Sequence, residues 1–181
     1  MSHLAILHGF GGTSQDNWQP YVQKRFESVG WQVDTPNIPN SDEADLERWI
    51  RYINENVTLT SNTVLVGHSA GCPLIISLLE RSDVKIKKAV LVSGFIEPIA
   101  DMVAPLIQDS YDWEKIKANC VDFYFINSDN DPYQCDDKQG RIMFDNLGGT
   151  QIIMSGEGHF GTSEYNQPYP EFPFLIKLIE E

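Results

Sequence analysis

The stretch Val64–Gly71, with the sequence VLVGHSAG, constrains the fold of this chain more than any other. A short apolar run rich in β-branched residues reaches Gly67, and Ser69 follows before a second glycine. Residues 72–79 are mostly apolar and predict a buried helix. A G-x-S-x-G sequence between a strand and a helix is the setting of a nucleophile elbow, a sharp turn in which strained backbone exposes the serine hydroxyl.

In a nucleophile elbow the glycines of the turn are needed for steric reasons. Gly67 and Gly71 leave the space that side chains would fill where the strand and the helix approach each other. The helix that begins after Ser69 directs its N-terminal N–H groups toward developing negative charge. The five-residue pattern alone also arises by chance, so the prediction depends on the rest of the chain.

Length and composition indicate a globular domain. The chain has 181 residues, which suits one domain over residues 1–181, and its 41% hydrophobic and 22% charged residues are ordinary globular values. The net charge is −13. An acidic surface repels nucleic-acid phosphates and anionic lipids, so we expect neither nucleic acid nor a membrane as a partner. The sequence identifies no partner protein.

The cysteines argue against two kinds of site. Cys72, Cys120 and Cys135 are odd in number and form no C-x-x-C pair, so neither a disulfide framework nor a zinc site is indicated. Other metal-ligand spacings are also missing, and we expect no metal and no cofactor. Reduced thiols fit a cytosolic protein, and the apolar start of the chain is too short for a signal peptide, so we expect a cytoplasmic location.

Apolar runs and amphipathic segments alternate along the chain. Strands are expected at residues 3–7, 31–35, 63–66, 88–92, 122–126 and 151–154. Helices are expected at residues 17–29, from Ser41 as N-cap to about 57, at 72–79, at 132–147 and at 170–181. This alternation predicts an α/β fold, with a parallel sheet and helices on both of its faces.

Four polar or glycine-rich segments each follow a predicted strand. They are residues 8–14 (HGFGGTS), the turn at Ser69, residues 128–133 (SDNDPY) and residues 155–160 (SGEGHF). Ligands of parallel sheets bind beyond the C-terminal ends of the strands, so we expect these segments to meet at one edge. Together they offer a serine, a carboxylate, a histidine and backbone N–H donors, in the chain order Ser, Asp, His of α/β hydrolases.

His159 is the predicted base of this constellation. A serine hydroxyl is a weak nucleophile and needs a base within hydrogen-bond reach. His159 lies in a loop whose neighbouring glycines let it fold over the site. We expect His3 to be structural, and His8 and His68 to pack or hydrogen-bond beside the two turns that contain them.

The acid that orients the histidine is Asp131 or Asp129. Asp131 is preferred because Pro132 follows it and holds it outside the α region at the start of the next helix. Asp129 fits an ordinary turn residue. The expected oxyanion donors are the backbone N–H groups of Phe10 and Ala70, although residues 8–14 alone also fit a plain glycine-rich turn.

The residues singled out so far resemble a known family. The segments that carry the resemblance are His8–Gly12, Asn17–Trp18, Thr35–Pro39, Gly67–Gly71, Asp129–Pro132, Gly158–Phe160 and Glu171–Pro173. Over nearly its whole length the chain is similar to the small serine-hydrolase family of the α/β-hydrolase superfamily, which includes retinoblastoma-binding protein nine and short bacterial proteins. The resemblance implies a compact α/β-hydrolase fold with about six parallel strands. It also implies a minimal lid at residues 95–119 and a catalytic triad of Ser69, Asp131 and His159.

The expected activity is hydrolysis of a small carboxylic ester, thioester or amide through an acyl-serine intermediate. Phe95 and Trp113 are candidates for lining the substrate pocket, although either also fits the core. The chain departs from the family at Gln134 and Cys135, where a hydrophobic residue and a proline are common. The alternative function is a binding or regulatory protein of low turnover, because a fold alone does not establish activity. Hydrolysis of a carbon–carbon bond or of an epoxide is a weaker alternative, and an epoxide hydrolase would carry an aspartate at the position of Ser69.

Overall fold

The computed structural model describes residues 1–181, and its centre is one sheet of six parallel strands in the order β2-β1-β3-β4-β5-β6. The strands are β1 (His3–Leu7), β2 (Gln32–Asp34), β3 (Thr63–His68), β4 (Ile86–Val92), β5 (Cys120–Asn127) and β6 (Thr150–Ile153). The helices are α1 (Gln19–Ser28), α2 (Leu46–Asn56), α3 (Gly71–Arg81), α4 (Trp113–Ala118), α5 (Asp137–Leu147) and α6 (Pro173–Glu180), with a short 3-10 turn at Ala104–Leu106.

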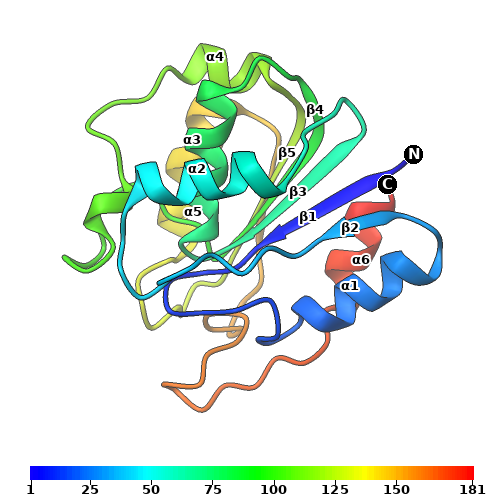
Figure 1. Ribbon diagram of the computed structural model, residues 1–181. Helices are drawn as coiled ribbons and strands as arrows, with labels where there is room; N and C mark the ends of the chain where they lie inside the picture. Colours follow the sequence, from blue (N-terminus) through cyan, green and yellow to red (C-terminus); the bar gives the residue numbers. More distant parts are fainter.

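Helices cover both faces of the sheet, because the inner strands are apolar on both faces. Leu4 and Ile6 of β1 point to the face covered by α1 and α6, whereas Ala5 and Leu7 point to the face covered by α2, α3 and α5 (Figure 1). The edge strands β2 and β6 contain no fully buried residue. Continuous apolar strands are typical of parallel sheets buried on both sides, and the predicted α/β-hydrolase fold is confirmed.

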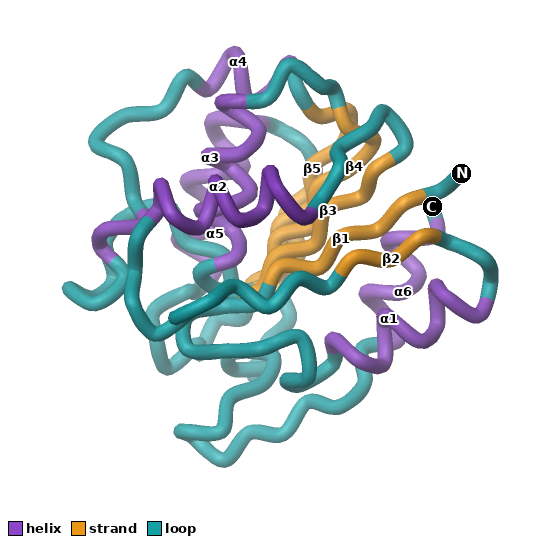
Figure 2. Tube along the Cα trace, viewed as in Figure 1, coloured by secondary structure: helices purple, strands orange, loops and turns teal.

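The direction of winding changes at β1, which lies between β2 and β3. The chain leaves β1 toward β2 at one edge and later returns to place β3 on the other side of β1. The chain leads from β1 to α1 on one face of the sheet and from β3 to α3 on the other, which leaves a crevice at the C-terminal ends of these strands, where open α/β sheets bind ligands. Figure 2 shows long loops gathered at this end of the sheet.

The starts of α2, α5 and α6 differ from the sequence prediction, and α6 begins at Pro173 rather than at residue 170, because proline suits the first turn of a helix. Ser41 is not the N-cap of α2: the side chain of Asp45 accepts the cap hydrogen bond from the N–H of Arg48 (3.0 Å), while the Ser41 hydroxyl donates to the carbonyl of Gly12 (2.9 Å). Helix α5 begins after Asp136 rather than at Pro132, because the Asp136 side chain caps it. Residues between Pro132 and Asp136 instead form part of the loop beside the site.

The connection from β4 to β5 is a small excursion with the 3-10 turn and α4, as expected for residues 95–119. Its first part passes over the C-terminal end of the sheet, and α4 lies beside α3 and α5. None of the helices combines the length and the apolar character needed to cross a lipid bilayer.

Candidate active site

Ser69 sits in the turn between β3 and α3 with a left-handed backbone, at φ 53°. Its N–H donates to the carbonyl of Val92 on β4 (2.9 Å), which fastens the turn to the neighbouring strand. The turn is possible because of its glycines: a Cβ at Gly71 would lie 2.3 Å from the carbonyl oxygen of Leu7, and one at Gly67 would lie 2.9 Å from the backbone of Gly71. The strained backbone is what a nucleophile elbow requires.

Asp131 and His159 form a buried hydrogen-bonded pair. The Nδ1–H of His159 donates to Oδ2 of Asp131 over 2.7 Å, and the side chains are 7% and 0% exposed. The other carboxylate oxygen, Oδ1, accepts from the N–H of Tyr133 (2.9 Å), so the orientation of the carboxylate is fixed. With the proton on Nδ1, the lone pair of the imidazole is on Nε2.

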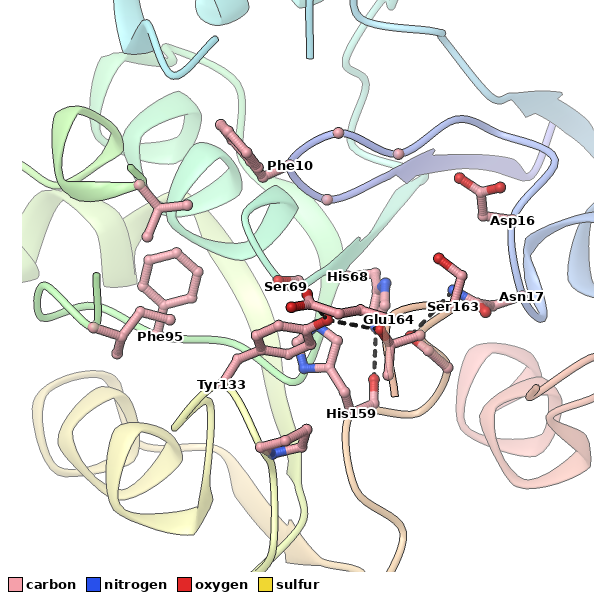
Figure 3. A pocket seen from close by; sticks show the side chains of 18 of the residues that line it. Phe10, Asp16, Asn17, His68, Ser69, Phe95, Tyr133, His159, Ser163 and Glu164 are labelled. Atoms are coloured by element: carbon pink, nitrogen blue, oxygen red, sulfur yellow. Dashed lines mark hydrogen bonds between the residues drawn. The ribbon is translucent and has the colours of Figure 1, made fainter. Parts of the chain in front are cut away.

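Ser69 and His159 line the same cavity and lie next to one another in Figure 3. Ser69 is half-buried, so its hydroxyl is reachable from the cavity. No hydrogen bond joins the two side chains. Contacts of this type commonly tighten only when a substrate is bound. The structure thus brings together all three residues of the expected triad.

Asp129, the alternative acid, has a different task. Its carboxylate accepts from the hydroxyl of Ser155 (2.7 Å) and the N–H of Gly156 (2.9 Å), and these hydrogen bonds, the first above all, lower its pKa. Asn130 makes a parallel contact, since its Oδ1 accepts from the N–H of Gly158 (2.8 Å). The loop after β5 therefore holds the loop that carries the histidine.

His68 holds the histidine loop from the other side. Its Nε2–H donates to the backbone carbonyl of His159 (2.8 Å), and the two ring centroids are 4.9 Å apart. Trp18 contacts His68 edge-on at 5.7 Å. Burial lowers the pKa of His68 to about 3, so the ring stays neutral at physiological pH. The prediction that His68 packs and hydrogen-bonds is confirmed, but its contact with the carbonyl of His159 was not foreseen from the sequence.

The two predicted oxyanion donors, the N–H groups of Phe10 and Ala70, have no hydrogen-bond acceptor within the protein. Gly9 lies directly against Ser69, since a Cβ there would be 3.0 Å from the Ser69 Cβ. The glycine loop after β1 and the serine turn are therefore in contact at the switch point. Two unpaired N–H groups beside a serine hydroxyl can stabilise an oxyanion.

Hydrogen bonds to the segment after β2 hold the glycine loop in place. His8 donates from Nδ1 to the carbonyl of Gly9 (2.8 Å), and its Nε2 accepts from the N–H of Ile38 (2.9 Å). Burial lowers the pKa of His8, which keeps this neutral tautomer. The N–H of Gly11 donates to the carbonyl of Ser41 (2.8 Å). Ser41 therefore supports the oxyanion loop rather than a helix.

A cavity of about 630 Å³ opens above Ser69. Phe95 lines this cavity, as the sequence suggested. Trp113 does not: its ring packs against Tyr111, with centroids 5.0 Å apart, and faces a separate hollow near α4 and α5. The alternation of aromatic and polar residues in this segment did not show which of the two would reach the site.

Cys135 lies beside the acid–base pair, and the sequence had offered no role for it. Its Sγ, a ring nitrogen of His159 and an oxygen of Asp131 all lie within 4.8 Å of one another, the only such group of metal-binding atoms in the chain. A hydrogen bond of 2.7 Å already joins the imidazole and the carboxylate. Burial raises the pKa of the Cys135 thiol well above its ordinary value, against a smaller opposite effect of the Ser69 hydroxyl. The thiol is therefore protonated and packs against the pair.

Comparison with known proteins gives the family. Residues 4–177 match the serine hydrolase family. The chain belongs to the serine hydrolase family. It is 24% identical to the serine hydrolase RBBP9 of Rattus norvegicus over 177 residues, which are 96% of this chain and 90% of RBBP9. It is 37% identical to YdeN of Bacillus subtilis (strain 168) over 116 residues, an alignment that spans 61% of either chain and so less than two thirds of that relative.

Two solved structures share the fold. The crystal structure of the ydeN gene product of B. subtilis matches with a TM-score of 0.90 and 28% identity, over 99% of this chain and 97% of that one. Est1E of Butyrivibrio proteoclasticus, solved with ferulic acid, matches with a TM-score of 0.68 and 12% identity, over 99% and 87%. The second likeness supports the fold alone. The family membership makes the chain a hydrolase.

Proposed function

We propose that this serine hydrolase cleaves a small carboxylic ester, thioester or amide through an acyl-serine intermediate on Ser69. In this proposal His159 is the general base and acid, and Asp131 orients it. The backbone N–H groups of Phe10 and Ala70 form the oxyanion hole. The observation that carries the proposal is the 2.7 Å hydrogen bond between Asp131 and His159, buried beside a serine with left-handed backbone.

Acylation follows from the tautomer of His159. Because Asp131 holds the proton on Nδ1, Nε2 is free to accept the proton of the Ser69 hydroxyl as the oxygen attacks the carbonyl carbon. The carbonyl oxygen becomes negative and accepts hydrogen bonds from the two unpaired N–H groups of Phe10 and Ala70. His159 then gives its proton to the leaving group, the bond to that group breaks, and the acyl group remains on Ser69.

Deacylation repeats these steps with water. His159 accepts a proton from water, whose oxygen attacks the acyl carbon. The second oxyanion then collapses, the bond between the acyl carbon and Ser69 Oγ breaks to release the acid, and His159 returns the proton to Ser69 Oγ. The carboxylate of Asp131 keeps its hydrogen bond with Nδ1–H and stabilises the imidazolium in both halves. Its second oxygen is held by the N–H of Tyr133, so it does not rotate away.

A fluorophosphonate probe tests the nucleophile, with mass spectrometry to locate the adduct. We expect one adduct on Ser69 in the folded wild type, and none in Ser69→Ala. The variant His159→Ala should label at least about 100-fold more slowly, because the base is lost. Ser28→Ala is a matched control: the Ser28 hydroxyl donates to the carbonyl of Arg25 on α1 (2.7 Å), and Ser28 does not line the cavity.

Two results would overturn the proposal. Folded wild type that is not labelled, and that does not hydrolyse p-nitrophenyl butyrate, has no activated serine and would fit a binding protein of low turnover. Labelling that is unchanged in His159→Ala would show that another group is the base. Circular dichroism of each variant separates loss of chemistry from loss of fold.

A further inference from the structure

The cavity above Ser69 has two unlike walls. The apolar wall comes from the segment after β4 and consists of Phe95, Ile99, Ala100, Met102 and Val103, with Phe10 beside it. The polar wall comes from two other loops and consists of Asp16, Asn17, Gln19, Thr162, Ser163 and Glu164. In Figure 3 Phe95 lies on one side of Ser69, whereas Asp16, Asn17 and Ser163 lie on the other. A substrate that extends to both sides of Ser69 therefore contacts apolar side chains at one end and polar side chains at the other.

The charge of the cavity has one sign. No lysine or arginine lines it, while Asp16 and Glu164 do. Neither carboxylate has a cationic partner: no lysine, arginine or histidine nitrogen lies within 4.0 Å of either. The chain as a whole adds a net charge of −13. An anionic substrate would therefore meet no counter-ion in the cavity, whereas a cationic substrate would meet two carboxylates. The negative electrostatic potential of the protein also favours the approach of a cation.

The position of His159 decides which end of the substrate meets the polar wall. The base must lie within hydrogen-bond reach of the leaving group to protonate it. Residues 161–164 follow His159 in the same loop, between β6 and α6. Tyr133 connects this segment to the imidazole of His159. The Tyr133 ring contacts the imidazole edge-on, with ring centroids 4.6 Å apart, and the Tyr133 hydroxyl donates to Oε2 of Glu164 over 2.7 Å. The leaving group is therefore on the side of Glu164.

Tyr133 also keeps the Glu164 carboxylate in place. The Tyr133 hydroxyl lies 2.7 Å from the Thr162 hydroxyl as well, so the three side chains form one polar group over the base. Burial, with smaller effects of Glu164, raises the pKa of Tyr133 to about 12, so the hydroxyl stays protonated and keeps donating. The hydrogen bond uses one carboxylate oxygen, and Oε1 has no partner within the protein.

Resting on the proposed acyl-serine chemistry, we propose that the preferred substrates are esters with an apolar acyl group and a positively charged alcohol. Phe95 and its neighbours contact the acyl group. Glu164, with Asp16 at the far end of the polar wall, selects the charge on the leaving group.

The test compares two butyrate esters of the same shape, butyrylcholine and 3,3-dimethylbutyl butyrate, in which carbon replaces the cationic nitrogen. The readout is the ratio of their kcat/KM values at low ionic strength. We expect the wild type to favour the cation roughly fivefold, as for one partly exposed ion pair. Glu164→Gln, which still accepts from Tyr133, should lower the ratio to the part that Asp16 supplies, and high salt should lower it in the wild type.

The matched control is Glu55→Gln, which removes one negative charge from an exposed position on α2 without any ion pair. Its ratio should equal that of the wild type. A wild-type ratio of one or less, or a ratio that Glu164→Gln does not change, overturns the preference. So does failure to cleave either ester by protein that a fluorophosphonate labels on Ser69. Protein that is neither labelled nor active on p-nitrophenyl butyrate instead refutes the proposed function itself.

Discussion

Asp131 Oδ2 lies 2.7 Å from His159 Nδ1, in a contact from which solvent is almost excluded. The neighbouring Asp129 reaches the same loop but binds Ser155 and Gly156 instead. Two aspartates of one turn therefore have separate tasks, one in orienting the imidazole and one in holding the loop that carries it.

Replacement of the two aspartates by asparagine should separate these tasks. Asp131→Asn keeps the shape but offers an amide that can favour the wrong tautomer of His159, so kcat should fall about 1,000- to 10,000-fold. Asp129→Asn keeps an acceptor for the Gly156 N–H, so its activity should fall by less than about tenfold. Hydrolysis of p-nitrophenyl butyrate measures both. Equal losses in the two variants would contradict the assignment of Asp131.

Gly9→Ala should damage the oxyanion loop without unfolding the protein. The new Cβ would be 3.0 Å from Ser69 Cβ and 3.2 Å from the carbonyl oxygen of His68, so the loop has to move away from the serine. We expect kcat to fall roughly 100-fold, the usual effect of losing one oxyanion donor. The control is Gly30→Ala, which lies after α1 and away from the cavity. It adds a Cβ that meets nothing within 4 Å and is strained by its φ of +82°, so it should lose about 1 kcal/mol of stability but keep its activity.

Stability should fall in mild acid because His68 is buried as the neutral ring. Its folded-state pKa of about 3 is below the ordinary value of 6.5, so the unfolded chain binds the extra proton between these values. Unfolding is therefore favoured as pH falls below 6.5, by about 2 kcal/mol at pH 5. Urea titrations of wild type and His68→Gln at pH 8 and pH 5 measure this. The variant should lose less stability over that interval, and an equal loss would show that His68 is not the group responsible.

Ser41→Ala and Asp45→Ala should have opposite profiles. The Ser41 hydroxyl holds the carbonyl of Gly12, so its loss should reduce kcat several-fold while the melting temperature changes little. Asp45 caps α2 through the N–H of Arg48, so its loss should cost about 1 kcal/mol of stability and leave kcat unchanged. Thermal melting with an esterase assay distinguishes the two. A helix destabilised by Ser41→Ala would restore the original prediction from the sequence.

The sequence alone determined the features that depend on local interactions. Apolar runs place the six strands, because strands buried on both faces need apolar side chains throughout. The glycines at positions 67 and 71 place the sharp turn at Ser69, because only a residue without a side chain fits where the strand meets the helix. Family membership also followed from these short motifs.

Only the tertiary structure decided the contacts between distant loops. His159 meets Asp131 across 28 positions and His68 across 91, and neither separation has a periodicity that a sequence pattern can display. Cys135 lies beside the acid–base pair and Trp113 faces away from the cavity for the same reason. Loop paths are set by hydrogen bonds and packing that exist only once the sheet has assembled, because the sheet brings the ends of its strands to one edge.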